Sequence, residues 1–415
     1  MRPLTQGTDE HDAGLSRDGK MLVYSAVCFR QSPAGRNGIA ERDEIGLLNS
    51  VREQGSGIRI SVVYLDFEQL GTSTVRPVLL GVLSARVARA INAGRFRVYL
   101  LEPRLAPAAV ASRTCRVADL ATALEETLAQ EGPIVTWSAH DLRIVKKAEL
   151  PQRLVQRFES RWVPALADVR RWKSRLYPDS TLPAPANAGG HALTVYMKAI
   201  GYDVPRSPAP GHAPDWLRHV LARLEAEDGN YRALSDRAKR HCHALLADTR
   251  HDCYGMRAVY ERACRELALE KAYRQTTYRI EMDGASYPIR IGRRHGALDT
   301  ALRGGRATTW ACVTAYNPQS ETRPQRENRQ RDAELKRYLR ARTIRWHPMA
   351  GVGDAGHWAP EPGVLAIGVS RARAERLGRE FGQAAVVWGR VGGKAELVWC
   401  NRLSQATRTP SASAS

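Results

Sequence analysis

The sequence predicts an α/β domain followed by a smaller α+β domain, and three observations lead to this prediction. Short apolar runs with turn-like connections follow one another from residue 59 to residue 101, which is typical of paired strands. Segments with helical periodicity then extend to residue 270. From residue 273 strand-like runs return with helices between them. At 415 residues, the chain is long enough for two domains with a core in each.

In the first predicted domain, residues 58–270, strands come first and helices dominate later. The first three apolar runs predict an antiparallel meander, because only short turns connect them. Gly132-Pro133 ends a helix and a fourth strand begins directly after it. The expected strands are 60–67, 75–82, 96–101 and 134–137, and the expected helices are 117–130, 150–163, 191–200, 215–226, 231–247 and 252–270.

The second predicted domain, residues 273–403, alternates strands with Arg-rich helices. Its GxGxxG segment, 351–356, is interpreted as a loop, because Pro360 and not a helix follows it. The flanking segments 1–57 and 404–415 are expected to be disordered, since they are polar and weakly periodic. The expected strands are 287–291, 310–314, 364–369, 384–388 and 395–399, with an Arg-rich helix at 325–342 and a second one around 371–379.

Composition limits the class of protein. The formal net charge is +20, which favours a polyanionic partner such as nucleic acid. Seven cysteines without a CxxC pair argue for a reducing compartment and against a disulfide framework. We find neither an apolar run long enough to span a membrane nor a secretory signal, so we expect a soluble, cytoplasmic protein without a membrane partner.

Paired carboxylates end the first predicted strand. Asp66 and Glu68 share one face of the strand, because alternate residues do. Two carboxylates so close resist joint ionisation unless a cation lies between them, and Mg²⁺ prefers oxygen ligands. The alternative is that both lie at the solvated end of an edge strand. Asp141 follows the fourth strand, Asp252 shares a helix face with the apolar stripe, and Asp168 is a weaker candidate.

These acids carry a resemblance to a known family. Residues 58–270 resemble the ribonuclease H-like superfamily and, within it, the DEDD group of 3′–5′ exonucleases. The resemblance implies a mixed sheet with flanking helices, two Mg²⁺ or Mn²⁺ ions, and hydrolysis of phosphodiester bonds in DNA or RNA. The family pattern of Asp-x-Glu on the first strand, Asp after the fourth strand and Asp on a late helix is matched by Asp66, Glu68, Asp141 and Asp252.

One position departs from the family pattern. The family carries Tyr or His four residues before the last Asp, where it orients the attacking water, and Asp248 stands there in this sequence. His243, His251 and Tyr254 are nearby candidates for the catalytic role. Three hypotheses therefore stay open: an active exonuclease, a catalytically silent nucleic-acid-binding module, and a protein-interaction scaffold.

The C-terminal region resembles a bacterial domain family of unknown function. The resemblance rests on Thr314-Ala315-Tyr316-Asn317-Pro318, Glu327-Asn328, Glu361-Pro362-Gly363 and Phe381-Gly382-Gln383-Ala384-Ala385. We expect Asn328 to cap its helix or to bridge to the turn at Asn317-Pro318. The Arg-rich helix is either a solvated face or a surface that binds nucleic acid, with Trp346 and Trp358 available for base stacking or for the core. The residues expected to contact nucleic acid are Arg326, Arg329, Lys336, Arg337 and Arg340.

Overall fold

The computed structural model describes residues 61–70, 76–86, 93–109, 114–182, 192–203, 213–354 and 359–403. These residues belong to two compact units, which divide between Glu266 and Leu267. The two terminal segments expected to be disordered, and Trp358, lie outside the described residues.

The N-terminal unit contains a mixed sheet in the order β4-β3-β2-β1-β5-β6. The predicted antiparallel meander is confirmed, because β1 pairs with β2 and β2 with β3 in antiparallel registers. The remaining pairs, β3 with β4, β1 with β5 and β5 with β6, are parallel. The strands are β1 (Ser61–Leu70), β2 (Arg76–Arg86), β3 (Arg95–Leu100), β4 (Cys115–Val117), β5 (Ile134–Thr136) and β6 (Trp162–Pro164).

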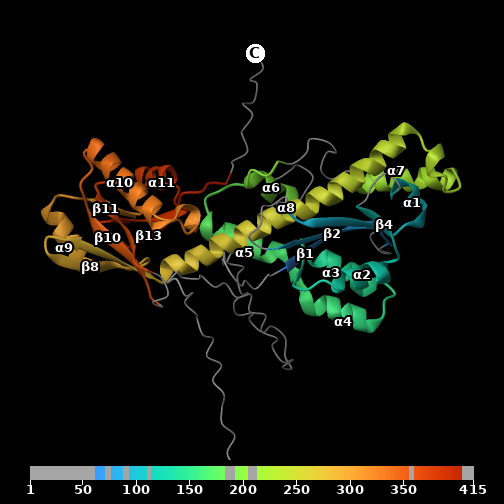
Figure 1. Ribbon diagram of the computed structural model, residues 1–415, viewed down its shortest axis with the longest axis horizontal. Coiled ribbons are helices and arrows are strands. Elements are labelled where there is room, and N and C mark those ends of the chain that lie inside the picture. The colour runs from blue at the N-terminus through green and yellow to red at the C-terminus, as the bar shows by residue number, and fades with distance from the viewer. Residues whose placement is uncertain are drawn as a thin grey trace, which may run out of the picture. The chain divides into compact units, whose positions relative to one another are not determined.

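Helices cover both faces of this sheet (Figure 1). Val63, Leu65 and Phe67 of β1 point to one face and pack in a core with α2 (Leu120–Leu128), α3 (Ala139–Lys147) and α4 (Gln152–Arg161). The even-numbered residues of β1 point to the other face, which α8 (Asp236–Arg274) crosses. The other helices are α1 (Ala106–Ala109), α5 (Ala165–Leu176), α6 (Leu193–Ala199) and α7 (Ala213–Ala226), with 3₁₀ turns at Pro103–Leu105 and Tyr231–Ala233.

The observed bounds of α8 differ from those of the two helices predicted at 231–247 and 252–270. The sequence predicted an interruption between residues 247 and 252, yet α8 is continuous over 39 residues. The segment 248–251 contains neither Pro nor Gly, and the Thr249 hydroxyl donates to the Leu245 carbonyl at 3.0 Å, so the helix has no local reason to stop. The predicted start of a helix at Val117 is also wrong, because Val117 ends β4. Helices α3 and α5 and strand β6 were not predicted.

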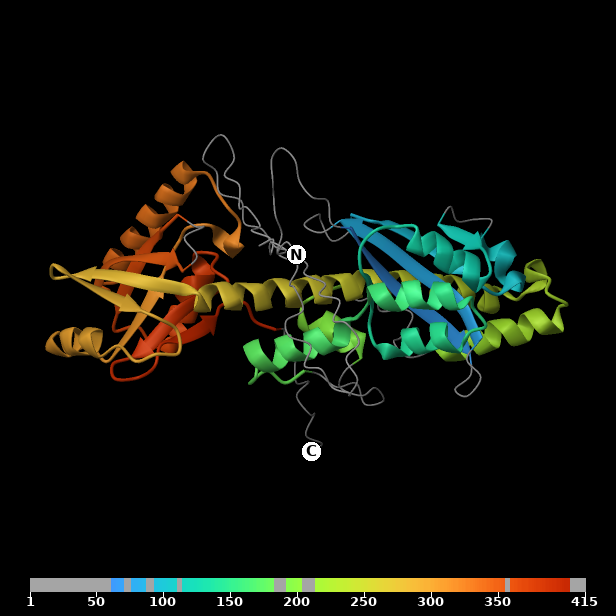
Figure 2. The same ribbon diagram turned by 90° about the horizontal axis from the view of Figure 1, so that it is seen from below.

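The C-terminal unit contains an antiparallel sheet in the order β13-β12-β9-β11-β10-β7-β8. Figure 2 shows helices on both sides of it. Helix α9 (Gly296–Gly304) packs on one face, and α10 (Gln325–Ala341) and α11 (Arg371–Glu380) pack on the other. The strands are β7 (Thr276–Met282), β8 (Ala285–Ile289), β9 (Thr309–Val313), β10 (Trp346–Gly353), β11 (Glu361–Ile367), β12 (Ala385–Arg390) and β13 (Glu396–Trp399), and a 3₁₀ turn lies at Pro318–Ser320.

The predicted strands and Arg-rich helices of this unit are present with shifted ends. The sequence did not predict β7, β10 or α9. The interpretation of the GxGxxG segment as a loop is wrong at its start, since residues 351–353 end β10 and pair with β7, and Gly351 also pairs with β11. The last two residues of the segment, Ala355 and Gly356, lie outside the described residues. Across the described residues, the helices lack the combination of length and apolar composition that crossing a membrane requires.

Candidate metal centre

Three acidic side chains converge on the face of the N-terminal sheet that α8 crosses. Asp66 and Glu68 project from β1, and Asp252 projects from α8. One carboxylate oxygen from each of the three lies within 4.8 Å of the other two. The register between β1 and β2 shifts between Glu68 and Gln69, just beyond the pair of acids, and the pairing then continues to Leu70. The structure thus brings three of the four predicted metal ligands together.

Gly81 of β2 allows α8 to approach the sheet at this point. Gly81 lies opposite Asp66 in the ladder between β1 and β2. A Cβ atom on Gly81 would lie 2.4 Å from Thr249 Cγ2 and 3.1 Å from Cys253 Sγ, both on α8. Any larger residue would therefore push the helix away, and Asp252 with it.

A buried polar network fixes α8 further along its length. The Tyr64 hydroxyl donates to Glu261 Oε1 at 3.1 Å, and Arg257 Nε donates to the same oxygen at 2.9 Å. Arg257 is fully buried and also donates to the carbonyls of Arg86 and Ala93. Because Tyr64 precedes Asp66 by two positions on β1, this network sets the rotation of α8 about its axis relative to the acids.

The fourth predicted ligand, Asp141, lies in the first turn of α3. The Ser138 hydroxyl caps this helix by accepting from the His140 amide at 3.2 Å. Burial raises the pKa of Asp141 to about 7, although hydrogen bonds from backbone amides, including that of Phe67, oppose the rise. Asp141 also raises the pKa values of Asp66 and Glu68, so it lies within electrostatic reach of both. Asp168, the weaker candidate, instead pairs with Arg171 on α5 at 2.9 Å.

Asp248 adds a fifth carboxylate that the sequence analysis did not assign to the site. It lies one turn before Asp252 on α8, and residues four apart share a helix face. Its charge raises the pKa of Asp252 and of Glu68, and burial raises its own pKa to about 6. The sequence placed Asp248 at the family's water-orienting position, four residues before Asp252, but the interruption expected at 248–251 left the two acids on separate helices.

The cluster holds its protons more tightly than ordinary acids do. Burial and then the charge of Asp252 raise the pKa of Asp66 well above its usual value. The same two causes raise the pKa of Glu68 to about 8, and burial followed by Asp248 raises that of Asp252 to about 7. Asp66 Oδ2 is buried and has no hydrogen-bond partner among the described residues. Oxygen donors with an unpaired buried carboxylate oxygen at their centre fit a hard divalent cation.

The three predicted catalytic side chains differ in their placement. His243 is exposed on α8, about 180° around the helix axis from Asp252. Tyr254 is 8% exposed and packs against Phe96, with ring centroids 6.2 Å apart. His251 is half-buried beside Asp252, and burial lowers its pKa.

His140, which was not among the predicted site residues, lies next to the acidic cluster. The side-chain nitrogen Nε2 of Gln69 lies 2.6 Å from Nε2 of His140, so the residues that follow Glu68 and precede Asp141 contact each other. Burial and Arg143 lower the pKa of His140, which favours its neutral form. The adjacency of His140 and Asp141 in the sequence was the available signal.

In the C-terminal unit, α10 presents the predicted basic side chains. Arg326, Arg329 and Arg337 are exposed. Lys336 pairs with Asp332 at 2.6 Å, and the Lys336 and Arg340 cations lie 5.6 and 5.8 Å from the ring centroid of Trp346. The ring of Trp346 therefore makes cation–π contacts with these two side chains.

The four C-terminal motifs identified in the sequence meet in one hydrogen-bonded network. Asn328 Oδ1 accepts from the Asn317 amide and Asn328 Nδ2 donates to Asn317 Oδ1, both at 2.9 Å, so the predicted bridge is present. Asn317 Nδ2 in turn donates to Glu361 Oε1 at 2.7 Å, and Gln383 Nε2 donates to the Tyr316 carbonyl at 2.8 Å. These bonds hold together a loop in which Asn317 has a left-handed backbone, with φ of 45°.

Comparison with known proteins supports the C-terminal resemblance. Residues 313–386 match a family described as "Protein of unknown function (DUF3293)", and all four motifs lie within that segment. Among solved structures, the chain is similar to one described as "Crystal structure of exonuclease I in complex with inhibitor BCBP". The identity is 13% and the TM-score 0.26, with 78% of this chain and 69% of that chain covered. No curated protein matches the chain.

Proposed function

We propose that the N-terminal unit is a ribonuclease H-like domain that hydrolyses phosphodiester bonds of DNA or RNA from the 3′ end. The observation that carries the proposal is the set of three carboxylate oxygens within 4.8 Å, with Asp66 Oδ2 buried and unpartnered among the described residues. The mixed strand order supports it, since an antiparallel meander followed by parallel strands is the order that the family resemblance implies. The proposal includes a reducing, cytoplasmic location, in which the six described free cysteines would remain thiols.

Under this proposal Asp66, Glu68, Asp141 and Asp252 hold two Mg²⁺ or Mn²⁺ ions, and Asp248 is available as a fifth oxygen donor. Bound ions would supply an activated water and stabilise charge on the leaving oxygen. The carboxylates must release their protons to bind a cation, and the raised pKa values of Glu68 and Asp252 predict weaker metal binding below about pH 7. Asp248, with a pKa of about 6, can accept a proton near neutral pH.

The basic face of α10 would contribute binding of the substrate. Arg326, Arg329 and Arg337 are exposed, and guanidinium groups bind phosphate oxygens in a bidentate geometry. We expect the affinity of the full chain for oligonucleotides to fall steeply with salt. Replacing Arg329 and Arg337 with Glu is expected to weaken binding for every sequence and to reduce the slope of that salt dependence.

Degradation of a 5′-labelled oligonucleotide tests the enzymatic proposal. The full chain with Mg²⁺ or Mn²⁺ should shorten the strand stepwise, and EDTA or a 3′-terminal phosphorothioate should stop it. Asp66→Asn should reduce the rate by about 10²-fold or more. Asp215→Asn, an exposed acid that pairs with Arg218, is the matched control. Equal rates for the wild type and Asp66→Asn would mean that a contaminant performs the reaction.

A specific observation favours a second candidate, a module that binds nucleic acid without hydrolysing it. The family's water-orienting Tyr or His is replaced by Asp248, and His243 lies on the far side of α8 from Asp252. In that case oligonucleotides bind and remain intact with every divalent metal. Comparison of Asp248→Asn with Asp252→Asn separates the two candidates, because the active enzyme should lose rate in at least one of them.

A further inference from the structure

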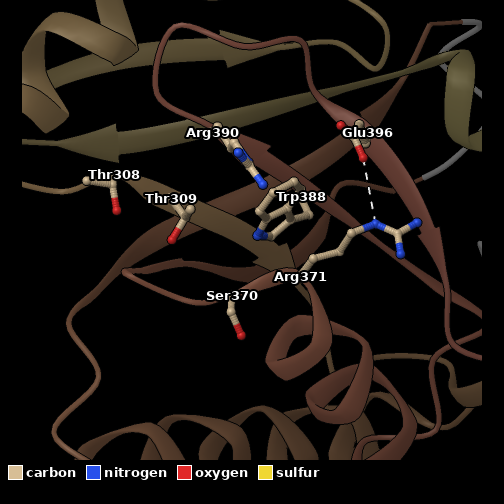
Figure 3. A pocket seen from close by; sticks show the side chains of 7 residues that line it. All are labelled: Thr308, Thr309, Ser370, Arg371, Trp388, Arg390 and Glu396. Carbon is tan, nitrogen blue, oxygen red and sulfur yellow. Dashed lines mark ion pairs between the residues drawn. The ribbon is translucent and has the colours of Figure 1, made fainter.

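A pocket lined mainly by polar and charged residues lies on the C-terminal unit, and no residue of α10, whose basic face the proposed function uses, lines it. Its volume is about 550 Å³, within the range of small-ligand sites. Figure 3 shows that its walls come from the start of β9, the start of α11, and strands β12 and β13. All of these elements belong to the C-terminal unit, so the pocket lies within one compact body.

The sheet fixes one wall of this pocket. Arg390 and Trp388 lie two residues apart on β12 and share a face. Thr309 of β9 is the direct partner of Arg390 in the ladder, and Glu396 of β13 is the direct partner of Trp388. Four side chains from three neighbouring strands therefore meet on the face that α10 and α11 also cover. The position of each side chain follows from strand register and does not depend on a flexible loop.

Helix α11 supplies the opposite wall. The indole of Trp388 donates to the Val369 carbonyl at 2.8 Å, which ties the segment before α11 to the sheet. Ser370 caps the helix by accepting from the Arg373 amide at 3.3 Å, so its hydroxyl proton remains available to another acceptor. The helix is 10 residues long and begins at the pocket, where its dipole favours negative charge.

The charge of the pocket is positive. Arg371 and Arg390 supply two guanidinium groups, and Glu396 supplies the one acid among the lining residues. Glu396 lies 3.7 Å from Arg371, and both side chains are more than half exposed, so this ion pair is weak. Arg390 forms no ion pair with any described residue, and its guanidinium lies 5.8 Å from the ring centroid of Trp388.

Hydroxyl donors complete the lining. Thr308 and Thr309 stand at the entrance to β9 beside Ser370, and Figure 3 shows these three hydroxyl side chains on the same side of the pocket. Within the described residues, the hydroxyls of Thr308 and Thr309 make no hydrogen bond. Two guanidinium groups, three hydroxyls and a helix N-terminus line the pocket as donors for anionic oxygens. Figure 3 shows the Arg371 side chain reaching toward Glu396, so it would turn from that weak ion pair to join the other donors.

We propose that this pocket binds the phosphate group of a nucleotide or of a nucleic-acid strand. A tetrahedral anion with several acceptor oxygens uses guanidinium, hydroxyl and helix amide donors together, whereas a carboxylate uses two or three of them. The floor of the pocket, formed by Trp388, is 4% exposed, so the site recognises charge and shape at the phosphate and not a stacked base. The site is separate from the carboxylate cluster and does not depend on nuclease activity.

The test measures binding to the full chain in EDTA, so that hydrolysis does not interfere. The probes are a fluorescein-labelled, 5′-phosphorylated tetranucleotide, its unphosphorylated counterpart, and inorganic phosphate as the competitor. The double variant Arg371→Gln, Arg390→Gln should lose about tenfold or more in affinity, because each guanidinium makes charged hydrogen bonds. Arg376→Gln is the matched control, since it removes one charge from the same helix away from the pocket. This control should change the affinity less than about twofold.

The outcomes separate the sources of the phosphate. If only the 5′-phosphorylated probe binds and a nucleoside monophosphate competes, the ligand is a terminal or free nucleotide phosphate. If both tetranucleotides bind equally, the ligand is a backbone phosphodiester. The proposal is overturned if the double variant binds as the wild type does, or if inorganic phosphate fails to compete. The measurement in EDTA requires no metal ion at the carboxylate cluster, so failure of the nuclease proposal leaves this result unaffected.

Discussion

Replacing Asp252 with Asn should stabilise the metal-free protein. Asp252 keeps its proton up to a pKa of about 7 in the folded state, whereas an exposed Asp releases it near 3.8. The unfolded chain therefore releases this proton first as the pH rises, and the free energy of unfolding falls between about pH 4 and pH 7. A neutral Asn side chain does not carry this cost.

The size of the effect follows from the shift in pKa. A rise from 3.8 to about 7 corresponds to about 4 kcal/mol once the pH exceeds 7, since one pKa unit is about 1.4 kcal/mol. Loss of interactions specific to the carboxylate reduces the gain, so we expect about 2–4 kcal/mol at pH 8. For a unit of roughly 200 residues this corresponds to a rise of about 5–15 °C in melting temperature. At pH 5 the gain should be much smaller, because the folded-state acid is then protonated.

Calorimetry of the full chain in EDTA at pH 5 and pH 8 measures this difference. Asp119→Asn provides the contrast, because Asp119 caps α2 and the backbone amide of Thr122 lowers its pKa. That variant should leave the melting temperature unchanged or lower it slightly. A strong loss of stability in Asp252→Asn at pH 8 would refute the reasoning and make Asp252 a structural acid.

Three further predictions concern the ligands, the helix contact and the second unit. Mg²⁺ at 100 times its Kd should raise the free energy of unfolding of the wild type by about 2.7 kcal/mol, which a thermal scan detects as a higher melting temperature. Asp66→Asn should abolish this rise. An equal rise in both proteins would mean that the ion binds at another site. Gly81→Ala should cost about 1–3 kcal/mol in urea unfolding and remove the response to Mg²⁺, because the added methyl group meets Thr249 on α8. Gly304→Ala, with open space around it, is the control, and the idea fails if both variants respond to Mg²⁺ alike. Burial raises the pKa of Glu361 to about 7, so Glu361→Gln should raise the urea midpoint at pH 8 and change it little at pH 5; the same change at both values would exclude titration of Glu361 as the cause.

The strands that carry the acids could be predicted from local pattern. Residues 60–67 form an apolar run that contains Asp66 near its end and is followed directly by Glu68, and the structure places both acids on one face of β1. The strands β4 and β6 are three residues long, too short for periodicity to reveal them, and neither follows a Gly-Pro stop of the kind that marks the equally short β5. Their place in the sheet is set by pairing with β3 and β5, which are distant in sequence.

The contacts that assemble the site are not local, and the sequence does not reveal them. Nothing in the sequence distinguishes Gly81 from other glycines, and only the structure shows that α8 packs against it. Likewise, the hydrogen bond between Tyr64 and Glu261 joins residues 197 positions apart. Sequence periodicity gives the face of each element, whereas the distance between faces depends on which small residues allow close approach.

The continuity of α8 explains why the acids form a larger set than the sequence suggested. A helix that began at Asp252 would place this acid at a terminus, where the helix dipole alone could account for it. The observed helix begins sixteen residues earlier, at Asp236, so Asp248 and Asp252 lie in its interior and gain nothing from its N-terminus. Two acids on one inward face, opposite two more on β1, cannot be explained as caps. The repulsion among these carboxylates has to be offset either by bound protons or by a bound cation. The thermal scan with and without Mg²⁺ distinguishes the two.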